Sequence, residues 1–245
     1  MAIPTLVNSS DALDADYQNV AWQDLLVTAE PADSEVLGEL NISEVVLSRA
    51  DWLAELHRQA DAALAINNWP LAEQALQQAL AEYPDDHGSR LRLAALLYGR
   101  GALVQAREQL QIGLTLAPEQ ADLRLTLARL LAEQQRYNAA LQVLDEVHPP
   151  LFEHLDYYSL KADMARRSNQ CEQAIATYKQ LLEHNRVGGW WLGLGLCQRQ
   201  IGEDFTAAFL QARSSANLGA ASQRFVEQQL QQLQQRGQDG QTQTD

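Results

Sequence analysis

The chain has 245 residues and a formal net charge of −14 at pH 7, and 46% of its residues are hydrophobic. This charge argues against a nucleic-acid-binding protein, which needs a basic surface to neutralise phosphates. No stretch approaches the roughly 18 consecutive apolar residues of a membrane span and no signal-peptide pattern opens the chain, so we expect a soluble protein or a soluble piece of a larger one.

Residues 1–46 form an acidic leader. Apolar residues between Leu13 and Trp22 have helical spacing, which indicates a short amphipathic helix that ends before Pro31. The composition favours a largely disordered segment. The alternative is a helical peptide that docks on a groove of this molecule or of another. The acidic residues of the leader are Asp11, Asp14, Asp16, Asp24, Glu30, Asp33, Glu35, Glu39 and Glu44.

Beyond the leader, an alanine recurs every 34 residues. Two further columns keep the same register, one twelve residues before each of these alanines and one four residues after it. A fixed period of this length indicates a repeat architecture. The three columns are Ala72, Ala106, Ala140, Ala174 and Ala208; Ala60, Ala94, Ala128, Ala162 and Leu196; and Leu76, Leu110, Leu144, Tyr178 and Ala212.

Each repeat has the apolar pattern of two helices, seen in the first repeat at residues 53–64 and 71–80. Alanine methyl groups let two helices approach closely where they cross, and a larger side chain would overpack the crossing. Large residues before the second helix, such as Trp69, are expected to plug the end of the helix pair. Pro84 and Pro118 are expected to end second helices, because proline lacks an amide hydrogen and clashes with the preceding turn.

The expected fold is all-α: a right-handed solenoid of five helix-turn-helix repeats with a C-terminal capping helix, in residues 47–236. His148-Pro149-Pro150 should shorten the second helix of the third repeat. A single repeat cannot bury enough apolar surface alone, so stacking on its neighbours must supply the rest. The repeats are expected at 53–86, 87–120, 121–154, 155–188 and 189–220, the cap at 220–236 and a disordered tail at 237–245.

The period, the small-residue columns and the final proline resemble the tetratricopeptide repeat over residues 53–220. Longer stretches resemble the tetratricopeptide-repeat proteins of mannose-sensitive haemagglutinin (MSHA) pilus biogenesis, a type IV pilus system of Gram-negative bacteria. This resemblance implies a chain on the periplasmic face of the inner membrane that helps to assemble or anchor the pilus machinery. Family members carry a membrane span near the N-terminus, which has no counterpart here. The stretches are residues 47–56, DDHGSRLRLAALLYGRGAL (85–103), DYYSLKADMARR (156–167), GGWWLGLGLCQ (188–198) and ASQRFVEQQLQQL (221–233).

No set of residues indicates catalysis, a metal site or a cofactor. The five histidines are scattered without metal-ligand spacing. Gly193-Leu194-Gly195 follows no expected strand and precedes no Lys-Ser/Thr, so we interpret its glycines as sites of close packing against the capping helix rather than as a phosphate loop. Cys171 and Cys197 are interpreted as buried free thiols rather than as a bridge. We therefore expect a non-enzymatic protein.

The remaining functional feature is a surface. In tetratricopeptide-repeat solenoids the first helices line a concave groove, and such a groove holds extended or helical peptides whose carboxylates bind arginines. The alternative is an ordinary solvated helix face. The expected function is an adaptor for a protein partner in pilus assembly. The alternatives are a self-association module that uses an exposed Trp190/Trp191 end or the N-terminal helix, and a general adaptor in another envelope assembly process. The expected groove residues are Leu91, Tyr98, Leu125, Arg129, Arg166, Arg167 and Trp190.

Overall fold

The computed structural model describes residues 47–242, with side chains to residue 235, and this part of the chain contains eleven α-helices and no strand. The expected leader helix lies outside the described residues. Leu47 begins a compact unit that contains all of the helices. They are α1 (Arg49–Ala65), α2 (Trp69–Glu82), α3 (His87–Gly99), α4 (Leu103–Leu116), α5 (Ala121–Glu133), α6 (Tyr137–Asp145), α7 (Leu155–Arg167), α8 (Cys171–His184), α9 (Gly188–Gln200), α10 (Thr206–Ser214) and α11 (Ala220–Thr242).

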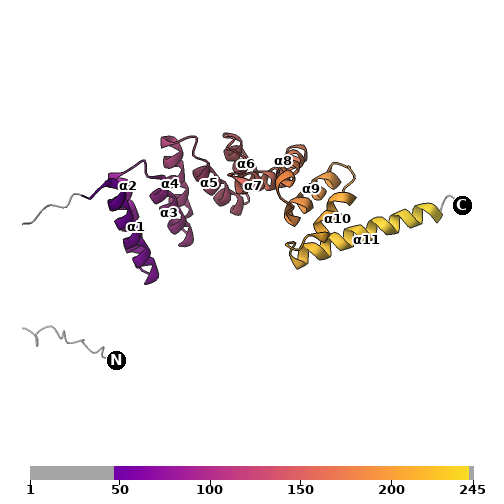
Figure 1. The fold of residues 1–245 in the computed structure, drawn as a ribbon, viewed down its shortest axis with the longest axis horizontal. Helices are drawn as coiled ribbons and strands as arrows, with labels where there is room; N and C mark the ends of the chain where they lie inside the picture. Colours follow the sequence, from indigo (N-terminus) through magenta and orange to yellow (C-terminus); the bar gives the residue numbers. More distant parts are fainter. Residues whose placement is uncertain (1–46, 243–245) are drawn as a thin grey trace, which may run out of the picture. The chain divides into compact units, whose positions relative to one another are not determined.

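The helices pair into five antiparallel hairpins that follow one another in a row, with α11 after the last of them (Figure 1). Each hairpin contacts the next, and the second helices α2, α4, α6 and α8 begin at intervals of 34 residues. The all-α solenoid of helical hairpins that the sequence predicts is therefore confirmed.

The alanine columns lie at the helix crossings. The five alanines that recur every 34 residues from Ala72 to Ala208 are 0–3% exposed. The column twelve residues earlier is equally buried except at Leu196 of the last hairpin, which is partly buried. The column four residues later is buried throughout, from Leu76 to Ala212. Small side chains at these positions let the helices of neighbouring hairpins share one continuous core.

First helices contact one another from hairpin to hairpin, at α3–α5, α5–α7 and α7–α9. The first helices therefore share one side of the row, which is the side that the sequence assigned to the groove.

Local chemistry sets the helix ends. Side-chain oxygens of Ser48, Asn68 and Asp86 accept hydrogen bonds from the backbone N–H groups at the starts of α1, α2 and α3. The helices α2 and α4 end two residues before Pro84 and Pro118, as predicted.

A pair of buried arginines stabilises the connections between repeats. Arg90 Nη2 donates to the Pro84 carbonyl oxygen at 2.6 Å, and Arg124 donates from Nε and Nη2 to the Pro118 carbonyl oxygen at 2.8 and 2.6 Å. Both residues are at most 6% exposed. The two residues are 34 positions apart, so the same contact recurs in successive repeats. Each cation satisfies a carbonyl oxygen that follows a helix and would otherwise lack a partner.

The third hairpin has a short second helix, as the His148-Pro149-Pro150 sequence predicts, because α6 ends at Asp145. Residues of α7 hold the C-terminal end of this helix. The Tyr157 hydroxyl donates to the Leu144 carbonyl oxygen at 2.9 Å, and the buried Lys161 ammonium lies 2.8 Å from an Asp145 carboxylate oxygen. The register of the repeats is kept across this loop.

Two packing expectations need correction. Trp69 does not plug its own helix pair: it is the first residue of α2, is 40% exposed, and lies beside Gly99 at the end of α3. The close approaches at Gly193 and Gly195 are made by Tyr178 of α8 and Phe209 of α10, and not by the capping helix. Both differences arise because each first helix sits between the second helices of two successive hairpins, so its small residues meet those aromatic rings.

The capping helix α11 also extends further than expected. It continues to Thr242, through the segment from residue 237 that the sequence assigned to a disordered tail. Glycine inside a helix costs only about 1 kcal/mol relative to alanine, and the intervening glutamines are good helix formers. The glycines Gly237 and Gly240 therefore do not end the helix.

Candidate protein-binding groove

An apolar hollow of about 180 Å³ lies between α3 and α5 on the side of the first helices. Ala95 and Tyr98 of α3 and Arg129 of α5 are exposed at its rim. The hollow exists because alanines occupy two successive positions of α3, leaving room that larger side chains would fill. Its lining residues are Ala94, Ala95, Tyr98, Leu110, Thr126, Arg129, Leu130 and Glu133.

A second hollow, of about 410 Å³, continues from the first toward the turn between α3 and α4. The two share Tyr98, Leu130 and Glu133, so they are contiguous. Gly101 in this turn has a φ of 80°, a backbone conformation that suits glycine. The second hollow therefore opens the groove to the edge of the solenoid.

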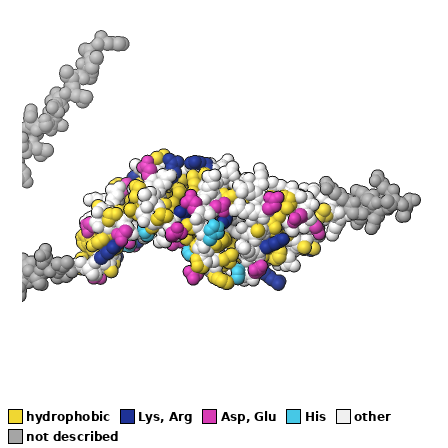
Figure 2. Space-filling model, turned by 90° about the horizontal axis from the view of Figure 1, so that it is seen from above, with side chains coloured by type: hydrophobic (Ala, Val, Ile, Leu, Met, Phe, Trp, Pro, Cys, Tyr) yellow, Lys and Arg dark blue, Asp and Glu magenta, His cyan; other side chains and the backbone are white. Residues whose placement is uncertain are grey.

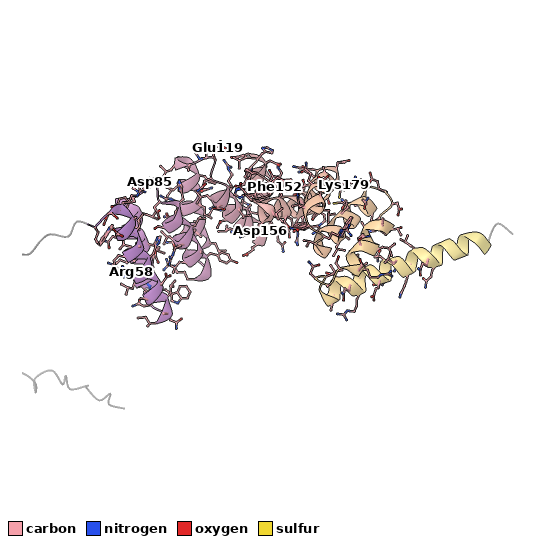
Figure 3. All side chains as sticks on the ribbon, in the orientation of Figure 1. Arg58, Asp85, Glu119, Phe152, Asp156 and Lys179 are labelled. Atoms are coloured by element: carbon pink, nitrogen blue, oxygen red, sulfur yellow. The ribbon has the colours of Figure 1, made fainter. Side chains whose placement is uncertain are left out.

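A third hollow, of about 300 Å³, lies at the other end of α5, where the α6–α7 loop approaches. Leu125 of α5 and Phe152 of the loop line it, and Phe152 is 74% exposed. Asp156 lines this hollow as well, and it lies in the middle of the row of hairpins together with Phe152 (Figure 3). A large aromatic ring held in solvent beside a hollow is a typical binding contact.

The three hollows follow the exposed face of α5, and we call them together the α5 groove. Arg129 lines the first hollow and its Nη2 atom lies 3.2 Å from a carboxylate oxygen of Asp156, which lines the third. Between Asp122 and Glu133 a helix rises about 16 Å, which matches about five residues of an extended peptide.

Polar groups in the groove pair across repeats. The Tyr98 hydroxyl bonds to Glu133 of the next first helix, and Arg129 pairs with Asp156 of the one after. Both members of the Arg129–Asp156 pair are more than half exposed. Solvent screens such a pair to roughly 0–1 kcal/mol, so a partner's carboxylate can replace Asp156 at little cost.

The expected groove residues fall into three places. Tyr98 and Arg129 share the first hollow, and Leu125 lines the third. Leu91 and Trp190 are partly buried against the core. The Trp190 indole N–H donates to the Ser159 hydroxyl at 2.9 Å. Neither of these two lines any of the three hollows.

Arg166 and Arg167 also line none of the three hollows. Both pair with Asp163 in their own helix. A side-chain hydrogen bond with Tyr137 raises the pKa of Arg167, although partial burial of the guanidinium acts in the opposite direction. The Arg167 guanidinium also stacks over the Tyr137 ring. Trp191 is partly buried like Trp190, so these two residues do not form an exposed tryptophan pair for self-contacts.

Phe152 is the groove residue that sequence reasoning missed as a binding contact. A signal was present, since an aromatic residue stands two positions after Pro150, where the repeat otherwise has a proline. Thr126 and Leu130 were missed because helical projection does not show which side chains leave a gap between two helices.

Among residues 47–235, no three histidine, cysteine or acidic side chains gather closely enough to hold a metal ion. None of the described helices combines the length and the apolarity needed to cross a bilayer. Acidic, basic and apolar side chains are interspersed on the face shown in Figure 2, without the extended basic stripe that nucleic acid requires.

Comparison with known proteins agrees with this fold. A family model described as tetratricopeptide repeat matches residues 57–121 and 160–221, which is more than half of the chain, and a second model of that description matches residues 113–164. No curated protein sequence matches the chain.

Solved structures of MamA share the fold. The crystal structure of MamA protein is 16% identical in sequence, covers 66% of this chain and 91% of its own, and superposes with a TM-score of 0.57. The structure of MamA from residue 41 to its end, from Desulfovibrio magneticus RS-1, is also 16% identical, covers 70% of this chain and 97% of its own, and has a TM-score of 0.56. At this identity the likeness extends to the fold alone.

Proposed function

We propose that this chain, which belongs to the tetratricopeptide repeat family, is a non-enzymatic adaptor that binds an extended peptide of a protein partner in the α5 groove. The observation that supports this most directly is the succession of three hollows along one helix, the first two of them contiguous, with Tyr98 and Phe152 exposed beside them. Exposed aromatic side chains that border apolar hollows are the usual centres of binding energy in protein interfaces.

The groove indicates what the peptide is like. Its apolar floor between α3 and α5 accepts an aliphatic side chain. Arg129, at the boundary of that hollow, binds a carboxylate of the peptide in place of Asp156. We therefore expect an extended segment that carries an acidic residue about one or two positions from an aliphatic residue.

A displayed-peptide library selected on the full chain tests this function. The affinity of the selected peptides is measured by fluorescence anisotropy for the wild type and for Tyr98→Ala and Phe152→Ala, each of which should weaken binding by about tenfold or more. Ile112→Ala is the matched control, because it removes an apolar side chain that is exposed on the second helix α4. Equal affinity for the groove variants and the control would show that the peptides bind elsewhere.

The partner that we propose belongs to a type IV pilus assembly of the MSHA kind, at the periplasmic face of the inner membrane. This part rests on the sequence stretches that resemble that family, at residues 85–103, 156–167, 188–198 and 221–233. Deletion of the gene should remove surface pili, as seen by electron microscopy. The wild-type gene should restore them, and a Tyr98→Ala/Phe152→Ala gene should not. Normal pili in the deletion strain would refute the pilus role and leave the groove to be judged by the peptide assay.

Self-association is the second candidate function, and one observation favours it. Ile66, in the turn after α1, is 70% exposed, and Val104, near the start of α4, is 58% exposed; the first residues of α2 and α4, Trp69 and Leu103, are also exposed. Apolar side chains gathered at one edge are typical of an interface between proteins. Light scattering over a concentration series distinguishes the two functions, because a molecule that stays monomeric at all concentrations has no such interface.

A further inference from the structure

Two thiols meet at the junction between the fourth and fifth hairpins. Cys171 is the first residue of α8 and Cys197 lies within α9, and their sulfur atoms are 2.8 Å apart. Both are free and at most 1% exposed. The two sulfurs need to approach by only roughly 0.8 Å to reach the length of a disulfide bond. No residue of the α5 groove takes part in this contact.

We propose that Cys171 and Cys197 form an intramolecular disulfide that covalently joins the fourth and fifth hairpins. The oxidant is a second disulfide, either of a small thiol such as glutathione or of a protein. A thiolate of the pair attacks that disulfide, forming a mixed disulfide and releasing one thiol. The other cysteine of the pair then displaces the second thiol, so two protons and two electrons leave the pair and one external disulfide is reduced.

Access to the pair comes from the position of the fifth hairpin. Among residues 47–242 it is the last hairpin of the row, and the cap α11 follows it. In a solenoid each repeat is stabilised by its neighbours, so terminal repeats open more readily than central ones. Burial raises the pKa of the Cys197 thiol. Exchange therefore proceeds through transient opening of α9, and it should be faster in a low concentration of urea.

The cross-link has a structural consequence. It closes a chain segment between residues 171 and 197 and so reduces the conformational freedom of the unfolded state. It also prevents α9 from separating from α8. Oxidising compartments such as the periplasm, where the proposed function places the chain, supply disulfides to such pairs, but the chemistry itself does not depend on the groove or on the partner.

The test uses the full wild-type chain, reduced, desalted and then incubated with glutathione disulfide. Trypsin digestion without a reductant should yield residues 168–179 linked to residues 187–199, and mass spectrometry of the intact chain should show the loss of two hydrogen atoms. Oxidation should raise Tm by about 5–10 °C, and dithiothreitol should reverse the change. Cys171→Ser and Cys197→Ser are the matched controls, in which oxidation leaves at most a mixed disulfide with glutathione.

The wild-type peptide map decides the matter even if a serine variant folds poorly. Two thiols that still react after oxidation and unfolding would overturn the proposal. So would a mixed disulfide with glutathione as the end product, or a link between two chains. A linked peptide pair without a rise in Tm would refute the stabilising role that we assign to the bond.

Discussion

Arg124 donates hydrogen bonds from Nε and Nη2 to the carbonyl oxygen of Pro118, at 2.8 and 2.6 Å. A buried cation in α5 thereby holds the chain that leaves α4. The same side chain reaches the Val143 carbonyl oxygen at 3.3 Å and pairs with Glu146. Arg124 therefore joins α5 to the chain that follows α4 and to α6, and the position of α5 depends on these contacts.

Replacing Arg124 by methionine should destabilise the chain by about 2–4 kcal/mol, because buried carbonyl oxygens lose charged donors while the volume of the side chain is nearly kept. Arg129→Met is the matched control and should cost less than about 1 kcal/mol, since its pair with Asp156 is solvated. Urea unfolding followed by circular dichroism measures both. Similar losses for the two variants would show that Arg124 is not a structural tie.

Replacing glycine by alanine should have opposite effects on stability at two positions of α9. A Cβ atom at Gly195 would lie 2.4 Å from the ring of Phe209, whereas a Cβ atom at Gly189 would meet nothing within 4 Å. Gly195→Ala should therefore lower stability by about 1–3 kcal/mol through overpacking. Gly189→Ala should raise it by up to about 1 kcal/mol, because alanine is the better helix former.

Thermal unfolding of both glycine variants against the wild type measures the contrast. A stabilising effect of alanine at both positions would mean that Phe209 moves aside freely. The core at the α9–α10 crossing would then be less tightly packed than the structure shows.

Alkaline pH should weaken the contact between α7 and the C-terminal end of α6. Burial raises the pKa of Tyr157 to about 12, and its hydroxyl donates to the Leu144 carbonyl oxygen. An unfolded tyrosine titrates near pH 10. The raised value means that the folded state holds the proton more tightly, so this stabilisation is complete below pH 10 and is lost as pH rises toward 12. Its size is roughly 2–3 kcal/mol.

Tyr157→Phe isolates this effect. At pH 8 the variant should be less stable than the wild type, because the hydrogen bond to Leu144 is missing. Between pH 8 and pH 11.5 the difference in the free energy of unfolding should shrink or change sign. Urea titrations at the two pH values measure it, and a difference that grows with pH would contradict the assignment.

The sequence alone predicts most of the fold, because the information is local and recurs. Ala106 and Ala140 mark helix crossings by their spacing, and Pro84 marks a helix end by its chemistry. The short α6 follows from Pro149 in the same way. Each of these features depends on residues within one repeat or on a fixed interval between repeats.

The candidate site is less predictable, because it depends on pairing between repeats. Helical projection assigns Tyr98 and Arg129 to the side of the first helices, and in the structure both line the first hollow. It did not show that Asp156 pairs with Arg129, or that Ser159 accepts a hydrogen bond from Trp190. Such partners are set by how far one hairpin turns relative to the next, which the sequence pattern does not specify.

Backbone NMR of the full chain, titrated with a library-selected peptide, tests the adaptor function most directly. The largest shift changes should fall on the amides of α5 and on the adjoining parts of α3 and the α6–α7 loop, and Phe152→Ala should reduce them. Changes concentrated on the second helices α4, α6 or α8, with α5 unaffected, would contradict the proposal that the α5 groove is the binding site.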